Sequence, residues 1–100
     1  MTQGRIFRME MLPNPIYLEV ADPNLDFSQA RRLADAEAGK RRGECMLLSW
    51  YNGKTGEFSP PVECGGGDKP SWLVYAESRG GEISVAVNEG EFVFLYKKIN

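Results

Sequence analysis

The chain has 100 residues, of which 42% are hydrophobic and 26% are charged, with a formal net charge of -2 and no histidine. These values are typical of one globular domain, predicted here over residues 1–100, and they exclude an intrinsically disordered chain. The absence of histidine excludes Ser-His and Cys-His nucleophile pairs and imidazole metal ligands. The slight negative charge disfavours a general nucleic-acid binder, and no apolar stretch is long enough to span a bilayer.

The N-terminal residues do not form a signal-peptide core, because Arg5, Arg8 and Glu10 interrupt their apolar run. A cytoplasmic location is therefore predicted. Two cysteines, Cys45 and Cys64, are too few for a disulfide scaffold, and we expect both to be thiols in a reducing compartment.

The first expected elements are two short strands. Apolar and charged residues alternate from Ile6 to Met11, which indicates a half-buried strand. Pro13-Asn14-Pro15 then interrupts the ladder, since proline has no backbone donor. The alternation resumes from Ile16 to Val20. We expect these two strands to form a hairpin or a sharp corner.

A helix is predicted from Phe27 to Lys40, because alanine and leucine residues recur there at helical spacing without any proline. Asp26 or Asn24 is the expected N-terminal cap, and the helix should end near Gly39 or Gly43. The small alanine side chains favour close packing of this helix on a sheet.

Two further strands and a loop are expected next. The run from Cys45 to Tyr51 is almost continuously apolar, which predicts a strand buried on both faces in the middle of the sheet. A brief strand from Glu57 to Ser59 follows a turn. The segment 60–70 contains three prolines and three consecutive glycines, so it is expected to be an irregular loop.

The pattern from Ser71 to Lys98 predicts a three-stranded antiparallel meander with tight turns at Gly80-Gly81 and Glu89-Gly90. Counting outward from the turns gives the register. The cross-strand pairs predicted for the last two strands are Ile83 with Tyr96, Val85 with Phe94, and Val87 with Phe92. One face of this meander is almost entirely apolar and is expected to face the core.

The second face of the predicted meander has a polar rim and an apolar centre. Its members are Leu73, Tyr75, Glu77, Ser84, Ala86, Val93, Leu95 and Lys97. Such a face must either be covered by the rest of the chain or serve as a binding surface. The predicted fold class is α+β, with one helix packed on a mostly antiparallel sheet of about five or six strands.

The glycine-rich segment from Cys64 to Pro70 is the first candidate for chemistry. Glycines can bring backbone N–H groups against a phosphate, and Lys69 adds a positive charge. The spacing does not match a Walker A loop and no helix is expected to follow, so a flexible connector is the favoured interpretation. Cys64 could be a reactive thiol, although Lys69 is the only cation near it.

Charged residues offer two weaker candidates. The basic residues Arg31, Arg32, Lys40, Arg41 and Arg42 lie on or after the predicted helix. They could bind nucleic acid, but solvated charges that favour the helix dipole are the simpler interpretation. Glu77 would lie on the second meander face, either at its polar rim or as an anchor in its apolar centre.

Four aromatic residues, Trp50, Tyr51, Phe58 and Trp72, flank the loops between residues 52 and 70. They suit recognition of a ligand and closure of a small core equally well. The sequence predicts no cofactor and no metal.

The leading functional hypothesis is a small non-catalytic module that binds a protein partner or a small ligand. Its candidate residues are Trp50, Tyr51, Phe58, Cys64, Lys69, Trp72, Tyr75 and Glu77. The alternatives are a small enzyme that uses carboxylates or Cys64, and a weak nucleic-acid binder that uses the basic helix. A homodimer through an outer strand of the sheet is also expected to be accessible.

Overall fold

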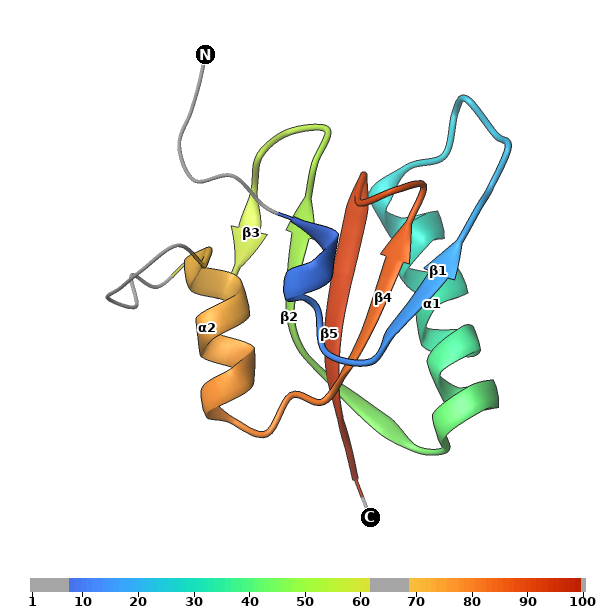
Figure 1. Cartoon of the computed structure of the whole chain (residues 1–100). Helices are drawn as coiled ribbons and strands as arrows, with labels where there is room; N and C mark the ends of the chain where they lie inside the picture. The colour runs from blue at the N-terminus through green and yellow to red at the C-terminus, as the bar shows by residue number, and fades with distance from the viewer. Residues whose placement is uncertain (1–7, 62–68, 100) are drawn as a thin grey trace.

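The computed structural model describes residues 8–61 and 69–99, which form a five-stranded sheet with helices on both faces (Figure 1). The elements in chain order are η1 (Met9–Met11), β1 (Pro15–Leu18), α1 (Phe27–Arg42), β2 (Cys45–Asn52), β3 (Phe58–Ser59), α2 (Ser71–Ser78), β4 (Ile83–Val87) and β5 (Phe92–Lys98). The strand order is β1-β4-β5-β2-β3, and the sheet is mixed because β1 runs parallel to β4. The α+β class is therefore confirmed, but with two helices rather than one.

Helix α1 forms as its local sequence predicts. The Asp26 carboxylate accepts a hydrogen bond from the Gln29 N–H at 2.8 Å, and the Gln29 side chain accepts one from the Asp26 N–H at 3.0 Å. This reciprocal capping box satisfies two helix-end donors that would otherwise lack partners. The helix continues to Arg42 and ends at Gly43, whose φ of 86° suits glycine.

The core on the α1 side of the sheet is built from small helix residues and large strand residues. The fully covered alanines of α1 lie at positions 30, 34 and 38. Phe27 fills the end of this interface, with its ring centroid 4.4 Å from that of Trp50 and 5.5 Å from that of Phe94. Alanine lets the helix backbone lie close to the sheet, so the strands supply most of the buried apolar volume.

The hairpin of β4 and β5 has the predicted register. Ile83 pairs with Tyr96, Val85 with Phe94, and Val87 with Phe92. Every residue of β4 is buried, so this strand is covered on both faces. The turn between the strands places Glu89 and Gly90 at positive φ values of 59° and 94°, as a tight hairpin turn requires.

The first strand of the predicted meander is wrong, because Ser71–Ser78 is helix α2. Its buried residues Trp72, Leu73 and Ala76 fall on one side of a helix, but periodicity alone does not distinguish a helix from a strand in so short an apolar run. Strand β1 occupies the position beside β4 that the meander required. The turn at Gly80-Gly81 therefore connects α2 to β4, and a Cβ on Gly81 would lie 2.8 Å from the Ala76 carbonyl oxygen.

Helix α2 covers the second face of the sheet, so the first of the two alternatives for its apolar centre, coverage by the chain itself, is the one observed. Ala86, Val93 and Leu95 have no exposed area and belong to a second core cluster that includes Leu12 and the buried residues of α2. Ser49 attaches α2 to the sheet, because its hydroxyl donates to the Trp72 carbonyl at 2.8 Å. The binding hypothesis loses the argument that rested on this face.

Three other strand predictions need correction. Met9–Met11 is a 3-10 helix rather than the end of a strand, and the rest of that predicted strand up to residue 7 lies outside the described residues. Strand β1 pairs with β4 instead of with the preceding segment, so the expected hairpin does not form. Strand β5 rather than β2 is central in the sheet, and β1 and β3 are its edges. Dimerisation through an edge stays a prediction.

Candidate functional site

The aromatic candidates do not gather at one site, because the sheet separates them. Trp50 packs on Phe27 on the α1 side, whereas Tyr51 stacks on Trp72 on the α2 side with centroids 5.1 Å apart and rings inclined by 11°. These three residues close the two cores. Phe58, on the edge strand β3, is 37% exposed.

The candidates near α2 form surface contacts of their own. The Lys69 ammonium lies 2.8 and 3.1 Å from the two carboxylate oxygens of Glu77. Tyr75 lies beneath the Arg79 guanidinium, 4.0 Å from ring centroid to Cζ. Glu77 is therefore a partly exposed ion-pair partner on a helix and does not stand opposite Ser84 on a sheet. Cys64 lies outside the described residues.

The basic residues of α1 are partly neutralised within the helix. The Arg41 Nε lies 2.6 Å from a Glu37 carboxylate oxygen, and the Lys40 ammonium lies 3.8 Å from the other. The hydrogen bond from Arg41 is the main cause that lowers the pKa of Glu37 below its usual value. This pairing agrees with the solvated-face interpretation, and the absence of nucleic-acid binding stays a prediction.

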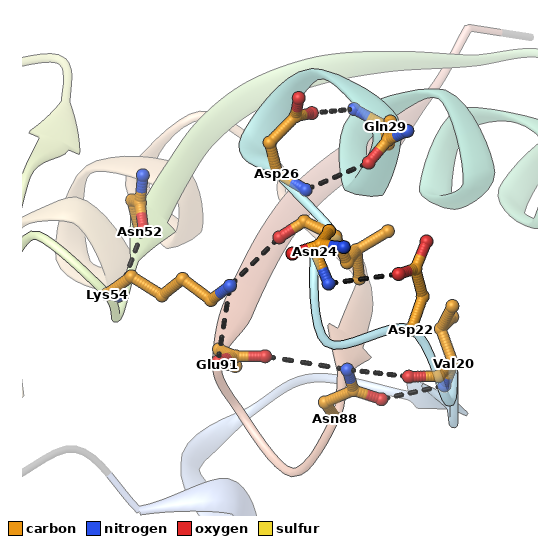
Figure 2. A network of polar contacts seen from close by, with 10 residues as sticks. Val20, Asp22, Asn24, Asp26, Gln29, Asn52, Lys54, Asn88 and Glu91 are labelled. Atoms are coloured by element: carbon orange, nitrogen blue, oxygen red, sulfur yellow. Dashed lines mark hydrogen bonds and ion pairs between the residues drawn. The ribbon is translucent and has the colours of Figure 1, made fainter.

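A first hollow, of about 380 Å³, opens at the end of the sheet where β1, β2 and β4 finish (Figure 2). We call it the strand-end cavity. Its lining residues are Val20, Ala21, Asp22, Pro23, Lys54, Asn88 and Glu91. The carboxyl ends of strands that run in the same direction are a common location for ligand sites in open α/β sheets.

The polar groups of the strand-end cavity mostly bind one another. The Asn88 amide accepts from the Val20 N–H at 2.7 Å and donates to the Val20 carbonyl at 3.1 Å (Figure 2). The Lys54 ammonium donates to the Leu25 carbonyl at 2.9 Å and lies 3.9 Å from the Glu91 carboxylate. This network explains how the loop after β1 is held, without requiring a ligand.

A second hollow, of about 300 Å³, lies between the carboxyl-terminal half of α1 and the ends of β2 and β5. We call it the α1 groove. Its lining residues are Arg31, Asp35, Gly39, Gly43, Glu44, Cys45, Leu47, Tyr96 and Ile99. This set combines ionic, phenolic, thiol and apolar side chains in one concave place, as ligand pockets do.

A chain of polar contacts leads from the core into the α1 groove. Tyr96 is only 2% exposed, and its hydroxyl donates to Asp35 Oδ1 at 2.6 Å. The second carboxylate oxygen of Asp35 lies 3.4 Å from Arg31 Nε. Because this ion pair uses Nε, both terminal amino groups of Arg31 are without a hydrogen-bond partner among the residues the structure describes. Tyr96 thus orients Asp35, and Asp35 forms a half-exposed ion pair with Arg31.

The hydroxyl of Tyr96 and the thiol of Cys45 stay protonated at neutral pH. Burial, followed by the hydrogen bond to Asp35, raises the pKa of Tyr96 far above its ordinary value. Burial also raises the pKa of the Cys45 thiol, and the charges of Lys98 and Arg42 oppose this effect more weakly. A protonated thiol is a poor nucleophile, so Cys45 contributes polarisable apolar surface to the groove.

Gly39 has no steric role in α1. A Cβ built on it would meet nothing within 4 Å, and its φ lies outside the left-handed region. Glycine in a helix interior costs about 1 kcal/mol relative to alanine. Gly39 lines the groove, and because glycine has no side chain it leaves the groove open. The open groove is accompanied by a lower stability of the helix.

Replacing Tyr96 by phenylalanine is expected to remove part of the loss of stability at alkaline pH. The unfolded chain ionises Tyr96 from about pH 10, whereas the folded chain keeps it neutral, so its contribution is complete below that pH and is lost above it. Above about pH 10, the free energy of unfolding should decrease with pH in both proteins, and the decrease should be larger in the parent than in Tyr96→Phe by about 1.4 kcal/mol for each pH unit. Denaturant titrations of both proteins between about pH 8 and 12 measure this difference. Parallel curves would contradict it.

Sequence reasoning missed the α1 groove. It treated Arg31 as a solvated charge of the helix and Tyr96 as a strand residue paired with Ile83, and no local pattern connects Tyr96 with Asp35, 61 positions away. The i,i+4 spacing of Arg31 and Asp35 was the only available signal, and such pairs are common on helix surfaces.

Within residues 8–61 and 69–99, no three acidic or cysteine side chains are grouped to hold a metal ion. None of the described helices combines the length and hydropathy needed to cross a bilayer.

Three comparisons place the chain among known proteins. A protein from Archaeoglobus fulgidus, described as uncharacterized, is 41% identical over 70 residues, which are 70% of this chain and 74% of the relative. A crystal structure of a protein from the same organism matches 89% of this chain and 98% of its own, with a TM-score of 0.75 and 30% identity. The family model for a domain of unknown function, DUF5619, matches residues 13–96. This chain therefore belongs to the DUF5619 family.

Proposed function

We propose that this protein is a non-catalytic module that binds a small molecule in the α1 groove. The observation that carries the proposal is the contact chain from buried Tyr96 through Asp35 to Arg31 at the groove wall. Binding sites depend on polar groups whose orientation is set by surrounding contacts, and this chain provides that arrangement.

The α1 groove is favoured over the strand-end cavity because its polar groups are less fully used. Asn88 in the strand-end cavity accepts from the Val20 N–H and donates to the Val20 carbonyl and to the Glu91 carboxylate. Arg31 in the groove keeps both terminal amino groups available, within the described part of the chain. The former arrangement stabilises a loop, whereas the latter leaves donors for a ligand.

A non-catalytic role is favoured because the hydroxyl of Tyr96 and the thiol of Cys45 in the groove are held neutral. A general base or a nucleophile needs a pKa closer to the working pH. The rival enzyme hypothesis places its chemistry on carboxylates or on Cys64, which lies outside the described residues. Finding that the protein turns over a small molecule held in the groove would favour that rival.

Filling the groove with a large side chain is expected to abolish small-molecule binding there. Gly39→Trp should preserve the fold because a Cβ at this position meets nothing within 4 Å, and it should weaken groove binding by about tenfold or more. A fragment screen by ligand-observed NMR, with amide chemical shifts to locate the bound fragments, measures this loss.

Ala36→Trp is the matched control, because it adds the same ring to an exposed position of α1 that does not line the groove. It should leave fragment binding unchanged. Fragments that bind parent and Gly39→Trp proteins equally, or whose shifts centre on Asn88 and Lys54, would contradict the proposal.

A further inference from the structure

We infer that the ligand of the α1 groove is a small monocarboxylate with a short apolar body, and that Arg31 binds its carboxylate. This inference rests on the proposed function and adds the chemical class of the ligand. It follows from three features of the groove: the guanidinium of Arg31, the apolar part of the wall, and the balance of charges.

Arg31 has the geometry of a carboxylate-binding residue. Its Nε lies 3.4 Å from Asp35, and Asp35 is itself held by the Tyr96 hydroxyl at 2.6 Å. A guanidinium anchored through Nε presents its two terminal amino groups as a planar fork, which matches the two oxygens of a carboxylate. The Asp35 carboxylate already accepts a hydrogen bond from the Tyr96 hydroxyl and pairs with Arg31. These two contacts reduce the repulsion between Asp35 and an incoming anion.

Part of the groove wall is apolar. Leu47 is half-buried, and Ile99 is 55% exposed although the Glu44 carbonyl holds its N–H at 3.0 Å. The protonated thiol of Cys45 completes this wall. A volume of about 300 Å³ lies at the small end of the range for ligand pockets, so the apolar part of the ligand must be short.

The charges around the groove balance one another and therefore disfavour a ligand that carries several charges. The positive groups are Arg31 in the wall and Arg42 and Lys98, which both act on the Cys45 thiol. The negative groups are Asp35 and Glu44 in the wall and Glu82, which also acts on that thiol. This balance offers no surplus of positive charge for a polyanion such as a nucleotide phosphate chain.

Hexanoate, hexanamide and hexylamine are suitable probes, because they share an apolar chain and differ in the charge of the head group. In NMR titrations of the full chain, hexanoate should shift the amides of groove residues. Hexanamide should bind about tenfold more weakly, because a neutral amide lacks the charge and the second oxygen that the fork pairs with. Hexylamine should not bind in preference to hexanoate.

Two variants test the role of Arg31. Arg31→Lys keeps the charge and loses the planar fork, so hexanoate binding should weaken by about tenfold. Arg32→Lys changes the neighbouring residue of α1, which does not line the groove, and should have no effect. Tyr96→Phe tests positioning, because releasing Asp35 should lower the preference for hexanoate over hexanamide and not merely weaken both probes.

The outcomes separate this inference from the proposed function. Equal groove binding of hexanoate and hexanamide, or unchanged hexanoate binding to Arg31→Lys, overturns the ligand class but leaves small-molecule binding in place. If groove-binding fragments are found but none of the three probes binds, the ligand class is also overturned. If no fragment binds in the groove at all, the proposed function itself fails.

Discussion

Replacing Trp72 by alanine is expected to lower the free energy of unfolding by about 3–5 kcal/mol. The indole is 2% exposed and stacks on Tyr51 with centroids 5.1 Å apart. Its loss would leave a cavity between α2 and the sheet, beside Leu95 and Val93. Only partial collapse of the surrounding residues is expected, so both the transfer free energy and the cost of the cavity contribute. Chemical denaturation of the parent and variant proteins measures the difference.

Tyr75 provides the matched control for Trp72. It is an aromatic residue of the same helix, but it is only partly buried and lies against the exposed Arg79 guanidinium. Tyr75→Ala should therefore cost only about 1 kcal/mol. Similar losses for the two variants would mean that Trp72 is not the residue that anchors α2 to the sheet.

Replacing Asn88 by alanine is expected to cost about 2–3 kcal/mol. The Asn88 side chain satisfies both peptide groups of Val20, with distances of 2.7 and 3.1 Å, and its N–H donates to the Leu18 carbonyl at 2.8 Å. Alanine would leave the half-buried groups of Val20 without these partners. It would also adopt a φ of 51° less readily than asparagine does. Thermal and denaturant unfolding measure the loss.

Asn88→Gly separates the two causes. Glycine adopts positive φ without steric cost but provides no amide, so it should recover about 1 kcal/mol of the loss in Asn88→Ala. A variant series in which neither substitution changes stability would show that the clamp on Val20 is not needed to hold the loop after β1.

Local sequence determined the elements whose signals lie within a few residues of one another. The cap expected at Asp26 or Asn24 and the alanines of α1 predicted the helix to within two residues of its end, and the structure adds the capping box of Asp26 and Gln29. The alternation in β4 and β5, with positive φ at Glu89 and Gly90 between them, specifies their register because a slip by one residue would expose the core face.

The identity of α2 depended on contacts distant in sequence. Ser71–Ser78 carries apolar residues that fit a strand or one side of a short helix, and its local pattern does not distinguish them. Whether this segment is a strand or a helix is decided by tertiary contacts. Strand β1 takes the position beside β4, so the segment is not needed in the sheet and packs instead as a helix on its second face. The segment that was expected to be a strand of the sheet is therefore the helix that covers its second face.

The candidate site shows the same division more strongly. The sequence by itself determined that Arg31 and Asp35 share an exposed side of α1 and that Tyr96 faces the core. Only the tertiary structure brought the Tyr96 hydroxyl within 2.6 Å of Asp35 and placed Gly39 beside an open groove. The physical reason is that periodicity specifies which side of an element a residue occupies, whereas the packing of α1 across β5 decides which residues of the two elements meet.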